Sequence, residues 1–408
     1  MVPPMRALLI CAFVVGCSSS SSQNGDDTGV DGGTDADPDG GTSELVDPAW
    51  PADVPLESAI DFPPYLNLLD GTTVVVSWRT TTATTGVVRY GTTPAKGSEL
   101  ASTTSGNLHH VTLSGLTAGA AYYYEVEITG TPVVRHGVFV LPGRSTWRLM
   151  HSGEFHAPSE SANVAKFVAK IREFRPHVLL ESGDMVDNGD DLAHWRSYFR
   201  TSAPWISNVL LLPSHSNHVN GSGGSSLLKD LFVIPNNERW YATRYGQMQL
   251  INIDSTKDAN ADVMTTELPW VQQQASTMHD GADDPTFVVA AWHHPACSSQ
   301  YYTRQGERAW VQDNLVAAFK ANGGVDLILA AHDKYYERST IAGGIVHVIT
   351  NVGNVSPEIP GGNHPSCTVE KSSRSSQSLL LIDVNGKTLK GRVIDQNFAD
   401  LDAFTITK

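Results

Sequence analysis

Carboxylate, imidazole and amide side chains stand at the ends of five short apolar segments in the second half of the sequence. In chain order the motifs are Gly153-Glu154-Phe155-His156, Gly183-Asp184-Met185-Val186-Asp187, Ser216-Asn217-His218, His293-His294-Pro295 and Ala331-His332-Asp333-Lys334. Side chains of these types serve acid–base chemistry and metal binding. Open α/β sheets carry their sites at the carboxyl ends of their strands, so the pattern predicts one polar site assembled from five loops.

The elements that must position these motifs alternate between short β-like runs and helical stretches with apolar spacing near 3.6 residues. Expected strands are 147–151, 178–181, 209–212, 249–254, 286–292 and 325–330, expected helices are 161–174, 190–199, 267–278 and 307–321, and residues 377–407 return to β hairpins. This alternation predicts a layered α/β domain.

The preceding part of the chain, residues 51–142, reads as an all-β module. Strand-like runs at 73–79, 85–90, 109–113, 122–129 and 133–141 are separated by Gly, Pro and Asn, as in a sandwich. Trp78 lies in an alternating run, and we expect it in the core of that sandwich.

The five motifs resemble the D-x-H, G-D-x-x-D, G-N-H, H-x-P and G-H-x-H signatures of calcineurin-like metallophosphoesterases. The β module is similar to that of purple acid phosphatases, with Leu116–Tyr124 resembling a fibronectin type III corner. The resemblance implies a fibronectin type III-like sandwich at 51–142, followed at 146–408 by a four-layer α/β/β/α metallophosphatase domain. It also implies hydrolysis of a phosphoric monoester, as in an acid phosphatase, by a hydroxide that Fe, Zn or Mn ions activate.

The same resemblance assigns roles to individual residues. Asp184 would bridge two ions, and His218 would act beside the leaving group. The ligands of the second ion would be Asn217, His293 and His332, with His294 only a neighbour, and those of the first ion Glu154 and His156. Arg304 and Lys334, together with His218, would contact the substrate.

The first ion's position departs from the family pattern. Glu154 replaces an Asp, Lys334 replaces a His and has no lone pair when protonated, and Asp187 replaces a Tyr. Ser216 and Ala331 replace glycines and crowd two loops. Three alternatives follow: a weaker first ion, a one-ion site in which Lys334 supplies the missing charge, or a pseudo-phosphatase that serves as a cell-surface binding protein.

The N-terminus indicates export. Arg6 precedes an apolar run of ten residues, Ala7–Gly16, which is too short to span a bilayer and ends at Cys17. We expect residues 1–17 to be a lipoprotein signal peptide, with lipid on Cys17 as the contact with the membrane. We expect residues 18–50 to be a disordered acidic linker, and the protein to be secreted and anchored to the outer membrane or cell surface.

Charge and cysteine content complete the expectations. A formal net charge of −15 without clustered Lys or Arg argues against a nucleic-acid partner. Once Cys11 leaves with the signal peptide and Cys17 takes lipid, Cys297 and Cys367 remain, either as one disulfide or as two buried thiols.

Overall fold

A computed structural model describes residues 47–102, 105–132, 134–159, 162–219, 227–256, 263–278, 284–299, 305–355 and 364–408. Residues 47–408 cluster as one compact unit. Across the described residues, every helix is too short or too polar to cross a bilayer.

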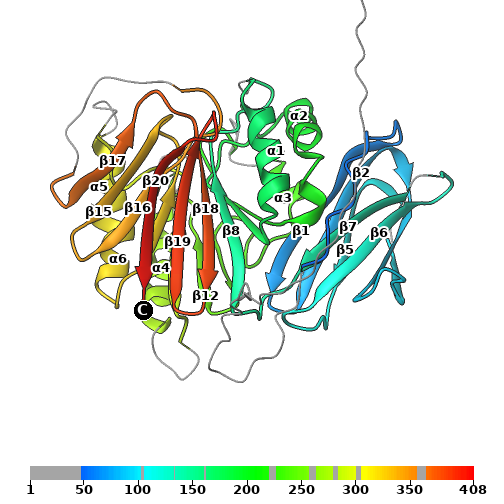
Figure 1. Cartoon of the computed structure of the whole chain (residues 1–408), viewed down its shortest axis with the longest axis horizontal. Coiled ribbons are helices and arrows are strands. Elements are labelled where there is room, and N and C mark those ends of the chain that lie inside the picture. The colour runs from blue at the N-terminus through cyan, green and yellow to red at the C-terminus, as the bar shows by residue number, and fades with distance from the viewer. Residues whose placement is uncertain are drawn as a thin grey trace, which may run out of the picture. The chain divides into compact units, whose positions relative to one another are not determined.

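One sheet runs through both predicted parts of the chain (Figure 1). Its strand order is β20 (Asp400–Thr407), β19 (Thr388–Asp395), β18 (Ser378–Asn385), β8 (Thr146–Ser152), β9 (Val178–Glu181), β10 (Leu210–Pro213), β1 (Ile60–Asp70), β2 (Thr73–Thr84) and β5 (Gly106–Leu113). β8, β9 and β10 are parallel, and β1 pairs in parallel with β10. The sandwich therefore shares a sheet with the α/β part of the chain and is joined to it by strand pairing.

The second sheet of the sandwich covers the β1–β2–β5 part. It consists of β4 (Ser98–Ala101), β3 (Gly86–Gly91), β6 (Ala121–Ile128) and β7 (Val134–Val140). Alternate residues of β6 are buried, as expected for a strand with one solvated face. Trp78 is fully buried and stacks on His109 with 4.7 Å between ring centroids, so it lies in the core as predicted.

The third sheet lies in the α/β part. Its order is β11 (Tyr241–Tyr245), β12 (Met248–Asn252), β13 (Phe287–Ala291), β14 (Leu327–Ala330), β16 (Ile345–Ile349), β15 (Tyr336–Ile341) and β17 (Cys367–Ser373). Leu250 and Val289 pack into the core shared with the first sheet, whereas Ile251 and Val288 pack into a second core. Because strand side chains alternate between faces, this division puts one apolar layer on each side of the sheet.

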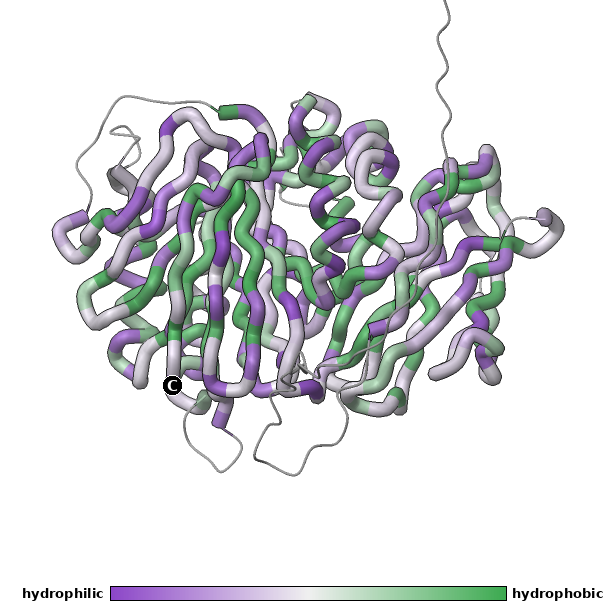
Figure 2. Tube along the Cα trace, in the orientation of Figure 1, coloured by the Kyte–Doolittle hydropathy of each residue, from purple (hydrophilic) through white to green (hydrophobic). Residues whose placement is uncertain are grey.

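Helices cover the outer faces. α1 (Val164–Phe174), α2 (Leu192–Ser202) and α3 (Leu228–Leu231) contribute to the first core. α4 (Leu268–Thr277), α5 (Gln305–Val311) and α6 (Ala317–Lys320), with the π-helical turns Val263–Glu267 and Gln312–Val316, lie on the other side. In α1 the buried residues Val164, Phe167, Val168 and Ile171 follow the helical repeat. Figure 2 shows that apolar residues concentrate on the central strands.

The elements follow the sequence pattern closely where apolar runs are uninterrupted. The strand predicted at 178–181 coincides with β9, and the predicted 377–407 hairpins form β18 to β20, with the turn at Gly386 (φ 51°). β1 was not predicted. It contains Pro63 and Pro64, which disfavour a strand, and its register shifts between Phe62 and Tyr65 accommodate them.

Candidate metal centre

The five polar motifs meet at the carboxyl ends of β8, β9, β10, β13 and β14. Three groups of side chains there have donor atoms within 4.8 Å of one another, and two of them include a carboxylate: Glu154, Asp184, His293 and His332, and His156, Asp184 and His218. Asp184 belongs to both groups, which is the arrangement expected of a bridging carboxylate. The structure therefore brings together the predicted ligands from β8, β9, β13 and β14, together with His218.

Several of these residues have a left-handed backbone. The φ angles are 62° at Glu154, 55° at His156, 52° at Asp184 and 65° at His332. Such angles are uncommon outside glycine, and they occur where surrounding contacts over-determine the loop. Here the loops after β8 and β9 bond to each other, with Glu154 N donating to Gly183 O (3.1 Å) and His156 N to Asp184 O (2.8 Å). The strained backbone turns the side chains into the centre.

The second-position group comprises Asp184, Asn217, His293 and His332, and its donor atoms converge. His293 Nε2 lies 2.8 Å from Asn217 Oδ1, 2.9 Å from His332 Nδ1 and 3.4 Å from Asp184 Oδ2. The Nδ1–H of His293 donates to the carbonyl of Ser182 at 2.8 Å, which places the lone pair on Nε2. Lone pairs that face one another in a buried site fit a cation, so this group suits a metal ion.

His218 lies at the edge of the centre. Its Nδ1–H donates to the carbonyl of Asp187 at 2.8 Å, and its Nε2 is 3.9 Å from Asp184 Oδ2. The side chain keeps 39% of its surface exposed, unlike the buried imidazoles of His293 and His332. His218 is thus the imidazole of this centre that an incoming substrate can reach.

The first-position group, Glu154, His156, Asp187 and Lys334, is bonded differently. His156 lies between two carboxylates, with Nε2 at 2.9 Å from Glu154 Oε2 and Nδ1 at 2.8 Å from Asp187 Oδ1. The other oxygen of Glu154 accepts the backbone N–H of His332 at 2.6 Å. The methylene that Glu has beyond Asp allows this reach, so Glu154 links the loop after β8 to the loop after β14.

Electrostatics reflect the same contacts. Burial lowers the pKa of His156, but Glu154 and Asp184 outweigh burial and raise it to about 9, while the ammonium of Lys334 opposes them. Burial alone would raise the pKa of Asp184, yet the imidazoles of His293, His218 and His156 hold it well below its ordinary value. Burial lowers the pKa of His294 to about 3, so that ring is neutral.

The two glycine replacements are accommodated by their neighbours. Ser216 Oγ accepts the backbone N–H of Asp184 at 2.9 Å and so helps to hold the bridging residue. A Cβ on Gly153 would come within 2.4 Å of Ala331 Cβ, so the glycine at position 153 leaves room for the methyl group of Ala331. The serine was expected only to crowd its loop, and the sequence held no signal of its hydrogen bond.

Other predicted residues fall into three classes. Cys297 and Cys367 form a disulfide with 5.9 Å between Cα atoms. His215 bonds the carbonyl of Glu238 with Nε2 (3.1 Å). Arg304 and Cys17, with the signal peptide and nearly all of the linker, lie outside the described residues.

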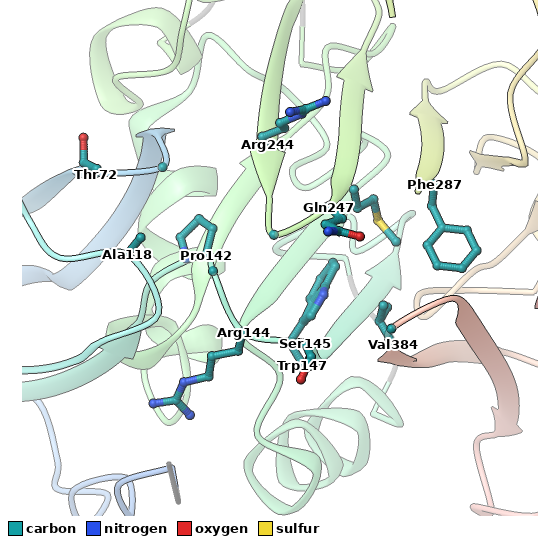
Figure 3. Close-up of a pocket in the computed structure, with 15 residues that line it drawn as sticks. Thr72, Ala118, Pro142, Arg144, Ser145, Trp147, Arg244, Gln247, Phe287 and Val384 are labelled. Atoms are coloured by element: carbon teal, nitrogen blue, oxygen red, sulfur yellow. The ribbon is translucent and has the colours of Figure 1, made fainter. Parts of the chain in front are cut away.

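A cavity of about 670 Å³ lies away from this centre, at the opposite ends of the strands (Figure 3). Trp147 and Phe287, at the starts of β8 and β13, line it together with Gln247 and Val384. Among the described residues, those that line it include no histidine, cysteine or carboxylate. This cavity therefore lacks the ligand types that the metal centre presents.

Comparison with known proteins places this geometry in a class. Residues 63–141 match the family model described as purple acid phosphatase, N-terminal domain. The structure is similar to a purple acid phosphatase from yellow lupin seeds (TM-score 0.71, 16% identity, covering 84% of this chain and 74% of that one). It is also similar to PhoD (TM-score 0.60, 10% identity, 86% and 89% covered) and to GAP50 of Plasmodium (TM-score 0.51, 15% identity, 65% and 89% covered).

The chain thus has a purple acid phosphatase N-terminal domain, a β-sandwich, followed by a metallophosphatase-like fold. The predicted fold class is confirmed, and the resemblance to purple acid phosphatases holds for the sandwich and for the whole fold.

Proposed function

We propose that this protein is a metal-dependent phosphoric ester hydrolase that acts on monoesters. The observation that carries the proposal is the convergence of Asp184, Asn217, His293 and His332 on one point, with the lone pair of His293 fixed toward it by Ser182. An ion bound there, Fe, Zn or Mn, would polarise a phosphoryl oxygen and lower the pKa of a water.

The chain's own residues supply the remaining functions. Asp184 is buried and held as the carboxylate, and Ser216 fixes its backbone. His218 is oriented by the carbonyl of Asp187 and is partly exposed, which suits proton donation to the leaving-group oxygen of a bound ester. Lys334 adds a positive charge on the side of His156, where an anionic substrate gains from it.

The test is hydrolysis of 4-nitrophenyl phosphate by the full chain with added Zn²⁺, Mn²⁺ or Fe³⁺. Asn217→Ala should lose metal-dependent turnover, whereas Asn322→Ala, which removes an amide bonded to Ala318 O in the helical layer, should keep it. Slower hydrolysis of bis(4-nitrophenyl) phosphate would support the monoester assignment. Turnover that is equal in the two variants would contradict the proposal.

A second candidate, a non-catalytic binding protein, is favoured by the first-position group. Glu154 is bonded to His156 and to the backbone of His332, and Lys334 stands where the resemblance expects a ligand. GAP50, which has the same fold, is described as the anchor in an inner membrane complex. Absence of turnover with every metal, in a chain that still binds one, would favour this candidate.

For location, we propose that lipid on Cys17 anchors the protein to the cell envelope. The apolar run that ends at Cys17 and the acidic segment after it support this proposal. Labelling with a radioactive fatty acid should mark the native chain and leave Cys17→Ala unlabelled. Equal labelling of both chains would contradict the anchor.

A further inference from the structure

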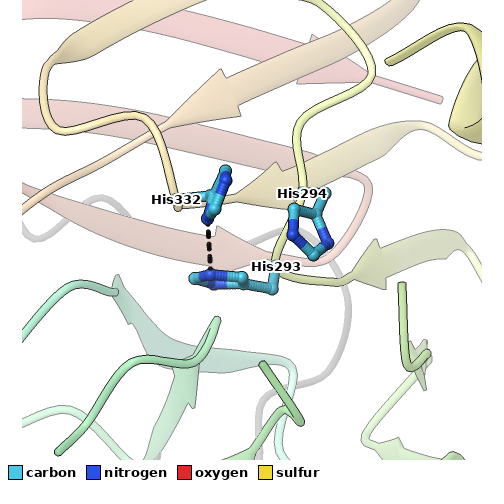
Figure 4. Close-up of side chains that lie close together, drawn as sticks. All are labelled: His293, His294 and His332. Atoms are coloured by element: carbon cyan, nitrogen blue, oxygen red, sulfur yellow. Dashed lines mark hydrogen bonds between the residues drawn. The ribbon is translucent and has the colours of Figure 1, made fainter. Parts of the chain in front are cut away.

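A third imidazole lies against the second-position group. His294, next to His293, is 6% exposed, and its ring centroid is 5.0 Å from that of His293 and 4.3 Å from that of His332. Figure 4 shows the three rings close together, with His293 and His294 carried by the segment after β13 and His332 by the segment after β14. Their donor nitrogens lie within 4.8 Å of one another, forming a group that shares two members with the carboxylate-containing one.

The tautomer of His294 is fixed by its neighbour. Its Nδ1 lies 3.1 Å from the carbonyl oxygen of Ser255 and 3.0 Å from the hydroxyl oxygen of the same residue. Since the carbonyl only accepts and the hydroxyl can accept, a hydrogen on Nδ1 satisfies both contacts. The lone pair of the neutral ring is therefore on Nε2. His293 is held in the same way by Ser182 O. A ring N–H that donates to a main-chain carbonyl is the usual companion of a metal-binding histidine.

Ser255 is itself held firmly. Its hydroxyl accepts the backbone N–H of His294 at 2.9 Å. The preceding residue, Asp254, bonds Arg239 Nε with its carboxylate (2.6 Å) and donates its backbone N–H to Glu267 (2.6 Å), and all three side chains are buried. This network fixes the loop after β12, and through Ser255 it fixes the orientation of the His294 ring.

We propose that His294 is a metal ligand that joins His293 and His332 and makes this a three-histidine centre. The inference rests on the proposed function, because the ion is the one placed at the second position. In a tetrahedral Zn²⁺ site, two coordinated nitrogens lie about 3.4 Å apart. Closing the triad on an ion thus needs donor separations of at most 4.8 Å to shorten by up to about 1.4 Å.

Three imidazoles change which metal is favoured. Imidazole suits Zn, Cu, Fe and Ni, whereas carboxylate-rich sites suit Mg, Ca and Mn. The centre is therefore expected to select Zn²⁺ over Mn²⁺, and His294 is the residue that creates this preference.

The test uses the full chain freed of metal and titrated with Zn²⁺ or Mn²⁺ alone, with hydrolysis measured in parallel. His294→Ala should weaken Zn²⁺ binding at least about tenfold and weaken Mn²⁺ binding less. X-ray absorption of the zinc form should count three coordinated imidazoles in the native chain and two in the variant. His347→Ala is the matched control, because His347 is equally buried and belongs to none of the metal-capable groups among the described residues.

His294→Gln is a second variant that nearly keeps the volume of the side chain. It can be measured in place of His294→Ala if the alanine variant does not fold. An unchanged imidazole count in a folded His294 variant, with Zn²⁺ affinity equal to that of His347→Ala, would overturn the inference and leave the hydrolase proposal standing. A native chain that neither binds Zn²⁺ nor hydrolyses the ester would overturn both.

Discussion

The two halves of the metal centre are built on different bonds. In the second-position half, the Nδ1–H of His293 and of the adjacent His294 donates to main-chain carbonyls, which leaves lone pairs directed inward. In the first-position half, both nitrogens of His156 contact side-chain carboxylates. The second-position half therefore directs imidazole nitrogens inward toward Asp184, whereas the first-position half holds its imidazole between two carboxylates.

This difference explains how the Glu154 and Asp187 replacements are accommodated in the first-position half. Glu154 gains the backbone N–H of His332, and Asp187 gains His156, so each replacement has a partner within the chain. A buried carboxylate that is paired and hydrogen-bonded does not require an ion for its stability. In the second-position half, His293 also faces carboxylates, with Nε2 at 3.4 Å from Asp184 Oδ2 and Nδ1 at 3.8 Å from Glu154 Oε1. These two carboxylates raise the pKa of His293 against the effect of burial.

The largest expected effect is on turnover, when a variant in one half of the centre is compared with a variant in the other half. Asp184→Asn should reduce metal-dependent turnover by about 10³-fold or more, because the loss of an ion removes several kcal/mol of transition-state stabilisation. Asp187→Asn, which removes the negative charge beside His156 Nδ1 and Ser159 Oγ, should cost less than about tenfold. Parallel kinetics and metal analysis of the two variants check this, and equal losses would contradict a functional difference between the halves.

The disulfide should stabilise the second-position side. Cys297 follows His293 by four residues and is bonded to Cys367, 70 residues further along the chain. Closing a loop of that length stabilises the folded state by about 4 kcal/mol in the chain-entropy account. Replacing both cysteines by serine should lower the free energy of unfolding in urea accordingly, and Zn²⁺ affinity should fall with it. A change below about 1 kcal/mol would argue that the bond is dispensable.

A pH effect is expected from Glu181, the last residue of β9, which lies three residues before Asp184. Burial raises the pKa of Glu181 from 4.5 to about 7, even though the Tyr198 hydroxyl donates to it at 2.6 Å. As the pH rises, Glu181 ionises in the unfolded chain before it ionises in the folded protein. The free energy of unfolding is therefore highest below pH 4.5 and falls as the pH rises to about 7. The loss amounts to about 3 kcal/mol.

Glu181→Gln should remove that dependence, because an amide does not titrate. Unfolding of both chains in urea between pH 4 and 8 gives the comparison. A native chain whose stability does not fall over that range would show that Glu181 is solvated or otherwise compensated.

The sequence predicted most of the frame for this centre because its strands are uninterrupted apolar runs. β9 and the hairpins after residue 377 lie where expected, whereas the prolines of β1 concealed a strand that joins the sandwich to the catalytic sheet. Residue types and strand ends predicted which side chains would meet. Their partners were not predictable, since Glu154 and the backbone of His332 are 178 residues apart, and His294 and Ser255 are 39 apart.

The smallest expected effect comes from a substitution that should make the first-position half a better metal site. Lys334→His should raise the zinc content from about one to about two ions per chain and increase turnover by about tenfold, a change of about 1.4 kcal/mol. The reason is that an imidazole lone pair replaces an ammonium that disfavours positive charge beside His156. Lys334→Gln is the matched control, since it removes the charge without adding a nitrogen donor. If both variants bind additional zinc equally, the charge of Lys334 limits metal binding in this half, and the number of ligands does not. If neither variant binds additional zinc, the bonds of Glu154 to His156 and to the backbone of His332 prevent a second ion from binding.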